Sequence, residues 1–383
     1  MASGPNPSLG RLIASHIFLH ACMAGMRMAA PLLALRQGHS EAAVGLLLAL
    51  FALTQVFLAL PAGRYADRHG LRRPIGLSVL ASMAGAGLAV AFPVFPVLCL
   101  SALLTGGATG AAAIALQRHV GRAAENATQL RQVFSWLAIG PALSNFVGPF
   151  AAGLMIDHGD FRLAFGLLAA LPLLSWLWVR GVQEPPPAVH AQGRARSRAW
   201  DLLAEPMLRR LMLVNWLLAS CWDVHTFVVP VLGHERGISA SVIGSILGAF
   251  AMAAAAIRLV LPLVAKHLRE WATVASAMAA TAVLFAVYPL LRAPLAMGLC
   301  SVLLGFALGS VQPMIMSMLH QITPEHRHGE AIAMRMMAIN LSSVTMPLLF
   351  GLAGAAIGIS GVFWIVGATV AGGTRLAFGL RGG

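Results

Sequence analysis

The stretch from Pro61 to Arg73 reads PAGRYADRHGLRR and places four arginines and one aspartate close together. Elsewhere charge is scarce, because charged residues make up only 10% of the 383-residue chain and 58% of its residues are hydrophobic. The mean hydropathy is +0.80. A water-soluble globule cannot hide that much apolar surface, so most of the chain must face lipid. The sequence therefore indicates an integral membrane protein, with the charged stretch in a loop at the membrane edge.

Apolar runs long enough to cross a bilayer recur along the whole chain. A spanning helix needs roughly 20 such residues, and breaks rich in Gly, Pro, Arg or Asp separate the runs. The first run is too long for the core of a cleaved signal peptide, and a second run follows it closely. We expect an all-α protein with twelve transmembrane helices, at approximately 11–35, 41–63, 74–92, 95–117, 131–156, 162–180, 209–232, 240–265, 271–290, 293–319, 331–355 and 359–378.

The basic residues are distributed unevenly between the two sides of this arrangement. The formal net charge is +13, which could favour nucleic acid as a partner. With the amino terminus inside, however, 19 lysines and arginines fall on the inner side and four on the outer side, namely Arg36, Arg162, Arg236 and Arg292. This is the positive-inside bias of membrane proteins. It predicts two cytoplasmic termini and argues against nucleic-acid binding.

The sequence repeats itself after 199 positions. That shift aligns CMAGMRMAAPLLALRQGHSEAAVGLLLALFA, from Cys22, with CWDVHTFVVPVLGHERGISASVIGSILGAFA, from Cys221. Pro31 then meets Pro230, and Gly38 meets Gly237. Such internal repetition indicates two similarly folded halves, as in transporters whose substrate site lies near the midplane.

A polar interval from Gly181 to Pro206 separates the two halves. It contains three consecutive prolines and the basic run GRARSR, and it has too few apolar residues to form a core. We therefore divide the chain into a six-helix bundle at 1–180, a cytoplasmic linker at 181–208 and a second six-helix bundle at 209–383.

The charged stretch of the opening lies between the second and third predicted spans. It resembles the loop signature of the major facilitator superfamily, a family of transporters that work by alternating access. The resemblance implies that the loop contacts the start of span eleven, near Glu330 and Ala331, and so holds the outward-open form. A simpler interpretation is that the basic residues of this loop only set the orientation of the chain in the membrane. The matching residues, called the latch residues below, are Gly63, Asp67, Arg68, Gly70, Arg72 and Arg73.

Predicted span five carries GPALSNFVGPFAAG, a pattern similar to that of many exporters of the superfamily, including drug/proton antiporters. Its matching residues are Gly140, Gly148, Pro149 and Gly153. Glycines let helices approach closely in lipid, and proline permits a bend. Ordinary helix packing explains the pattern almost equally well. The arginine that related exporters often carry in span four is absent here, near Gly106, so any proton site lies elsewhere.

Polar residues inside spans are candidates for the transport pathway, because burying charge in lipid is costly. Arg27 and Asp223 have similar depth on repeat-related helices, where an ion pair or a shared substrate would relieve their burial. Arg335 and Arg258 lie toward the inner ends of their spans, where snorkelling to the interface is an alternative. The predicted substrate and proton pathway consists of Arg27, Asp223, His16, His20, Asn215, Gln312 and Arg335.

These features predict a secondary transporter in a bacterial cytoplasmic membrane that exports small amphiphilic compounds against proton entry. Asp223 is the first candidate for the proton carrier and His20 the second. Proton-coupled uptake of an organic anion is the alternative, and a non-transporting membrane scaffold or sensor is a more distant one. We find no pattern of an enzyme, cofactor or metal site, and we expect no obligate protein partner. The four cysteines lie in predicted spans as packing residues.

Overall fold

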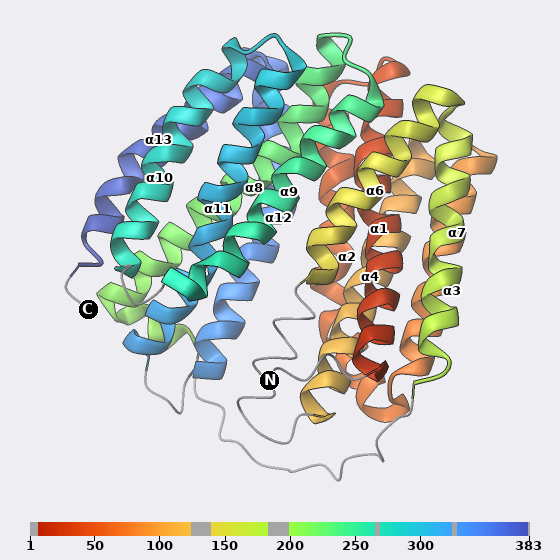
Figure 1. Ribbon diagram of the computed structural model, residues 1–383, viewed down its shortest axis with the longest axis horizontal. Helices are drawn as coiled ribbons and strands as arrows, with labels where there is room; N and C mark the ends of the chain where they lie inside the picture. Colours follow the sequence, from red (N-terminus) through yellow and green to blue (C-terminus); the bar gives the residue numbers. More distant parts are fainter. Residues whose placement is uncertain (1–6, 124–138, 183–198, 265–268, 324–327, 382–383) are drawn as a thin grey trace. The chain divides into compact units, whose positions relative to one another are not determined.

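The computed structural model describes residues 7–123, 139–182, 199–264, 269–323 and 328–381. These residues form twelve long α-helices and two short 3-10 helices, η1 (Ala199–Ala204) and η3 (Tyr288–Leu290) (Figure 1). The α-helices are α1 (Pro7–Arg36), α2 (Glu41–His69), α3 (Arg72–Ala91), α4 (Phe95–Ala123), α6 (Ile139–His158), α7 (Phe161–Val179), α8 (Pro206–Glu235), α9 (Ala240–Val264), α10 (Glu270–Val287), α11 (Pro294–Ile322), α12 (His328–Ile357) and α13 (Ile359–Phe378).

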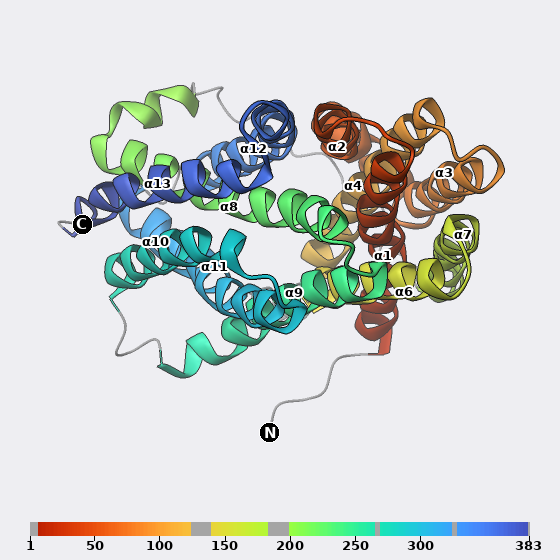
Figure 2. The ribbon, with the colours of Figure 1, turned by 90° about the horizontal axis from the view of Figure 1, so that it is seen from above.

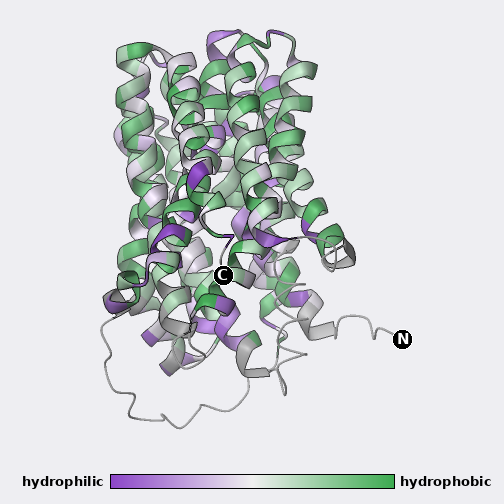
Figure 3. Cartoon of the chain, turned by 90° about the vertical axis from the view of Figure 1, so that its left-hand side faces the viewer, coloured by the Kyte–Doolittle hydropathy of each residue, from purple (hydrophilic) through white to green (hydrophobic). Residues whose placement is uncertain are grey.

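Eleven of these helices are long and apolar enough to cross a membrane, by length and composition. Most of the helical ribbon in Figure 3 has the colour of hydrophobic residues. The helix outside this set is α6, whose described part begins at Ile139 and ends on the polar pair Asp157 and His158. The beginning of the predicted span 131–156 lies outside the described residues. The chain is a multi-pass membrane protein of the all-α class.

The helix boundaries reproduce the sequence repeat. Helix α8 ends 199 residues after α1 (235 − 36 = 199). Helix α11 begins 199 residues after α4 (294 − 95 = 199). Gly38 and Gly237, which follow α1 and α8, have φ angles of +83° and +65°. That conformation favours glycine after a helix. The two pseudo-symmetric six-helix halves are thereby confirmed.

The chain divides into two compact units, which are described separately. Unit 1 comprises residues 1–39, 46–190 and 238–248, and unit 2 comprises residues 40–45, 191–237 and 249–383. The start of α9 thus belongs to unit 1, and the start of α2 belongs to unit 2. Part of the predicted linker forms η1, whereas residues 183–198 lie outside the described ranges.

Each unit has its own helix packing. In unit 1, α1 packs against α4, α6 and α7, and α3 packs against α4 and α7 (Figure 2). In unit 2, α8 packs against α11, α12 and α13, while α10 packs against α11 and α13. A buried cluster around Leu12, Leu71, Ile75 and Val179 joins α1, the α2–α3 turn, α3 and α7 in unit 1. In unit 2, the packing of α8 against α11 and α12 brings together the helices that carry the candidate site.

Candidate functional site

Helix α8, in unit 2, carries two residues of the predicted pathway, Asn215 and Asp223. Asn215 and Trp222 are seven residues apart, which corresponds to about two helical turns, so they share one face of α8. Asp223 follows immediately. Asn215 is 3% exposed and Asp223 is 6% exposed, whereas Trp222 is partly buried. Two polar groups are therefore withdrawn from solvent on one side of this helix.

Asp223 accepts hydrogen bonds from two serines of α12. The Ser342 hydroxyl donates to Asp223 Oδ2 at 3.0 Å, and the Ser343 hydroxyl donates to Oδ1 at 3.3 Å. Hydroxyl groups can also accept a hydrogen bond, so they can serve either a carboxylate or a protonated carboxyl group. The contacts therefore suit an aspartate that changes protonation state.

Arg335, two turns before Ser342 on α12, lies in the interior of unit 2. It is 4% exposed, so the alternative in which it snorkels to the membrane interface is wrong for this structure. Its Nε donates to Asn215 Oδ1 at 3.0 Å, and one terminal nitrogen contacts Met316 Sδ at 3.6 Å. A thioether is a weak acceptor. The arginine is thus held by one amide and by little else among the described residues.

Arg258 of α9 brings a second positive charge to unit 2. Its Nε donates to the carbonyl of Gly309 at 3.3 Å, and its guanidinium lies 5.9 Å from the centre of the Trp222 ring. The distance to the ring suits a cation–π contact. Arg258 is partly buried, and its charge repels that of Arg335. The interior of unit 2 thus holds two arginines.

A further buried network surrounds His225, which the sequence analysis leaves out of the predicted pathway. The ring is fully buried and stacks on Phe250, with 4.1 Å between centroids. His225 Nε2 and the Tyr288 hydroxyl each lie 2.9 Å from the Ser301 hydroxyl. These residues come from α8, α11 and the turn after α10. No local spacing links them, so the sequence carries no signal for this network.

The other predicted pathway residues occupy different positions. On α1 in unit 1, His16 is 8% exposed, and its ring lies 5.6 Å from that of His20. Gln312 is exposed on α11. Arg27 belongs to unit 1 and Asp223 to unit 2, so their predicted ion pair stays a prediction.

The latch residues surround the tight turn between α2 and α3. Gly70 has a φ of +73°, which lets α3 begin at Arg72 directly after the turn. Arg72 donates to the carbonyl of Val182 at 2.8 Å, while Arg118 of α4 donates to that of Ala66 at 2.5 Å. Arg68 and Arg73 are exposed, and a methyl group on Gly63 would lie 3.9 Å from Ile114 of α4, an ordinary contact distance. The side chain of Asp67 is outside the described set, so its contact with α12 stays a prediction.

The glycines of α6 lie where other helices approach in unit 1. A methyl group on Gly148 would collide with the carbonyl of Ala21 on α1, and one on Gly153 would collide with the carbonyl of Ala240 on α9. Gly140 faces the His16 ring. The same contact is close from the α9 side, because a methyl group on Gly244 of α9 would lie 2.5 Å from the carbonyl of Pro149 on α6. Helix α6 therefore packs against α1 and against the start of α9.

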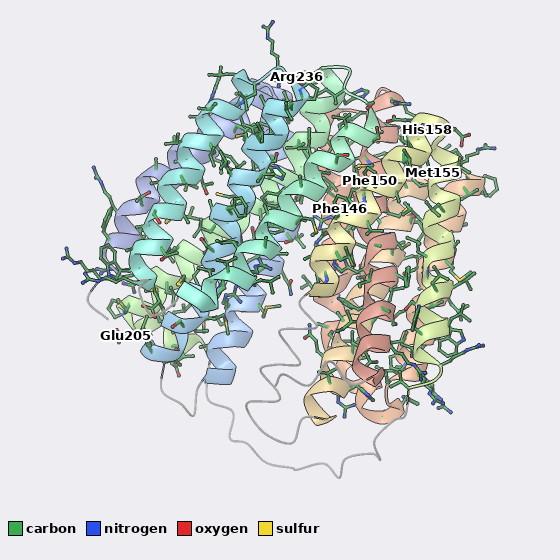
Figure 4. The ribbon with its side chains drawn as sticks, in the orientation of Figure 1. Phe146, Phe150, Met155, His158, Glu205 and Arg236 are labelled. Carbon is green, nitrogen blue, oxygen red and sulfur yellow. The ribbon has the colours of Figure 1, made fainter. Side chains whose placement is uncertain are left out.

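Aromatic residues extend this contact of α6. Phe146 and Phe150, labelled in Figure 4, are one turn apart and stack with 5.5 Å between ring centroids. Gly248 of α9 lies directly against the Phe146 ring, so a methyl group there would clash with it. Gly244 and Gly248 thus present one glycine face of α9 to α6.

Asp157 at the end of α6 caps the start of α9. Its carboxylate accepts backbone hydrogen bonds from Ala240 at 3.0 Å and from Ser241 at 2.8 Å. Partial burial raises the pKa of the Asp157 carboxyl, but hydrogen bonds from Ser241 and Ala240 outweigh burial and leave the pKa below its ordinary value. The helix dipole favours an anion at this position as well. Sequence reasoning misses this cap.

Unit 2 contains the symmetry-related helix contact without that cap. A methyl group on Gly351 of α12 would collide with the carbonyl of Glu41 on α2, and one on Gly45 would collide with the carbonyl of Pro347. Position 355, which is related to Asp157 by the 198-residue offset between Pro149 and Pro347, is an alanine. In its place α2 carries Glu41 in its own first turn. The start of α9 thus has a carboxylate supplied by another helix, Asp157 of α6, whereas the start of α2 has a carboxylate of its own, Glu41.

The family model for the Major Facilitator Superfamily matches residues 12–300 and 211–381. The chain is 27% identical over 208 residues to the inner membrane transport protein YajR of Escherichia coli K12, a match that covers 52% of the chain and 45% of YajR. The chain thus spans about half the length of that relative. It is 28% identical over 345 residues to the class C tetracycline resistance protein of Escherichia coli, covering 85% of the chain and 84% of that protein.

Among solved structures, the chain is similar to a bacterial homologue of the human lysosomal transporter Spinster in an inward-facing and occupied conformation. The TM-score is 0.79 at 12% sequence identity, and the match covers 99% of the chain and 98% of the other structure. At this identity the similarity concerns the fold alone.

Proposed function

The chain belongs to the Major Facilitator Superfamily, and from this premise we propose that it exports small amphiphilic organic compounds in exchange for protons. The proposal places it in a bacterial inner membrane with both termini in the cytoplasm, as the distribution of basic residues predicts. Transport would proceed by alternating access of two repeat-related halves.

The observation that carries proton coupling is the buried position of Asp223. An ionisable residue inside a membrane-spanning helix is costly to bury and is a functional candidate for that reason. Asp223 is 6% exposed and contacts hydroxyl groups that can serve both of its protonation states. Proton uptake and release at this carboxylate would link substrate movement to the proton gradient.

Export is favoured by two features. The chain is similar to a tetracycline resistance protein along most of its length. The glycine and proline pattern of α6 resembles that of exporters, and these glycines lie at close helix contacts. Proton-coupled uptake of an organic anion is the second candidate, because the buried Arg335 offers positive charge inside unit 2.

Transport by the purified chain in proteoliposomes tests the proposal. A pH gradient is imposed, and a panel of organic acids and lipophilic cations is offered while a dye reports internal pH. An exporter that exchanges substrate for protons moves a compound against proton flow. Movement in the same direction as protons supports the uptake alternative, and vesicles that move no compound contradict transport altogether.

A further inference from the structure

Arg335 and Asn215 form a buried pair that has unused hydrogen-bond donors. Asn215 Oδ1 accepts from Arg335 Nε, but Asn215 Nδ2 is buried without a hydrogen-bond partner among the described residues. The other contact of the guanidinium is the weak acceptor Met316 Sδ. Buried donors without acceptors are costly, and protein interiors rarely retain them without a reason. The Arg335 guanidinium and Asn215 Nδ2 therefore both have donor capacity for a further acceptor.

The surroundings of this pair add positive charge. On α11, Gly309 and Met316 are seven residues apart, as Asn215 and Trp222 are on α8. Arg258 contacts Gly309 and Trp222, whereas Arg335 contacts Met316 and Asn215. The two guanidinium groups are thus about two turns, or about 10 Å, apart along the same pair of helices. Both attract an anion to the interior of unit 2.

Asp223, the acidic residue nearest in this region of α8, forms its hydrogen bonds with α12 about two helical turns away from Arg335. Ser342, which donates to Asp223, lies seven residues after Arg335 on α12, a separation of about 10 Å along the helix. Among the described residues, the hydrogen-bond partners of Arg335 are the Asn215 amide and Met316 Sδ, neither of which is a carboxylate. The positive charge of Arg335 thus has no direct neutralising partner among the described residues.

We propose that Arg335 and Asn215 bind the anionic group of the transported compound, a carboxylate or a similar oxyanion. Arginine matches the geometry of carboxylates, and its charge-assisted hydrogen bonds are short and strong. The Asn215 Nδ2 group donates the neighbouring hydrogen bond. Trp222 and Met316 offer apolar contact to the remainder of an amphiphilic acid. The inference rests on the proposed transport function and adds the substrate class, but it does not depend on the direction of transport.

Binding of matched aromatic probes to the purified full-length chain in detergent tests this inference. Naphthoate carries the anionic group on an apolar ring, and naphthamide replaces that group by a neutral one of similar size. Titration calorimetry should give naphthoate at least tenfold tighter binding than naphthamide. Naphthalenesulfonate, a second oxyanion, should behave like naphthoate. If no anionic probe binds more tightly than its neutral counterpart, the proposal is wrong.

Variants locate the site. Asn215→Asp hardly changes the shape of the side chain but places a carboxylate beside Arg335, so it should weaken naphthoate binding at least tenfold. Arg335→Gln should have the same effect and Arg335→Lys a smaller one. Arg375→Gln removes an exposed arginine of the same unit and should leave binding unchanged. Unaltered naphthoate affinity in a folded Asn215→Asp protein would overturn the assignment.

A separate measurement distinguishes failure of the site from failure of the proposed function. The same proteins are reconstituted, and movement of radiolabelled naphthoate is followed. If the chain binds naphthoate through Arg335 but moves no compound in either direction, the anion site is supported and the proposed transport function is contradicted. If the chain transports neutral or cationic compounds without preferring naphthoate, the proposed transport function is supported and the anion site is contradicted.

Discussion

The backbone amide of Ser241 donates a hydrogen bond to the carboxylate of Asp157 at 2.8 Å, so that the end of α6 caps the start of α9. The two residues are 84 positions apart in the chain (241 − 157 = 84), but both belong to unit 1. A cap of this kind satisfies amides that have no partner within their own helix.

Loss of the cap should reduce stability. Asp157→Ala should lower the free energy of unfolding by about 1 kcal/mol, the usual value for an N-cap residue. Thermal unfolding of the detergent-solubilised protein measures the change. Asp201→Ala, at an exposed position in η1, is the control and should have little effect. Equal unfolding temperatures for both variants would contradict a stabilising cap.

The same cap should make stability depend on pH in a defined direction. The pKa of Asp157 lies below its ordinary value of 3.8 in the folded protein, so folding favours the ionised form. Its contribution is fully present above the ordinary pKa and is lost as pH falls through the lower, folded pKa. The difference in unfolding temperature between wild type and Asp157→Asn should therefore be constant near neutrality and shrink below about pH 4. A difference that grows on acidification would show that the assigned direction is wrong.

Close packing of α6 predicts a steric effect at Gly153. A methyl group there collides with the carbonyl of Ala240, and backbone on both sides leaves little room to adjust. Gly153→Ala should therefore destabilise the protein by about 1 to 3 kcal/mol, the range for overpacked sites. Gly166→Ala on α7 meets open space and should be neutral or slightly stabilising. Thermal unfolding compares the two, and tolerance of Gly153→Ala would argue against the close approach.

The latch residues should affect conformational exchange more than substrate binding. Asp67 is located near the end of α2, at the membrane edge that the sequence predicts for this loop. Asp67→Asn should lower the maximal transport rate strongly and change substrate affinity only a few-fold. Initial rates over a range of substrate concentrations separate the two quantities. A large loss of affinity at an unchanged maximal rate would assign Asp67 to the binding site.

Much of the fold is predictable from the sequence because the repeat constrains it. Gly38 and Gly237 match at an offset of 199, and both adopt the left-handed conformation that a turn after a helix requires. Helix lengths follow from the apolar runs, since lipid demands about 20 such residues. The same logic predicts the multi-pass topology.

Residue contacts inside each unit are less predictable. The burial of Arg335 depends on which side of α12 faces the protein, and a helix whose polar and apolar residues are spread around its axis carries no such signal. The Asp157 cap joins residues that are distant in sequence. The hydropathy pattern indicates only that a predicted span ends next to this aspartate, and it does not reveal the contact with α9. The sequence selects Asn215, Asp223 and Arg335 as candidates, but only the structure places Arg335 on Asn215 and Asp223 on the α12 serines.

Gradient-driven transport by Asp223→Asn tests proton coupling through Asp223 most directly. Proteoliposomes with an imposed pH gradient are loaded with a compound that the wild-type chain moves, and accumulation is compared with downhill exchange. The account predicts that Asp223→Asn loses accumulation against the gradient and retains downhill exchange, because the amide cannot take up and release a proton. Accumulation by Asp223→Asn with the wild-type pH dependence would contradict it.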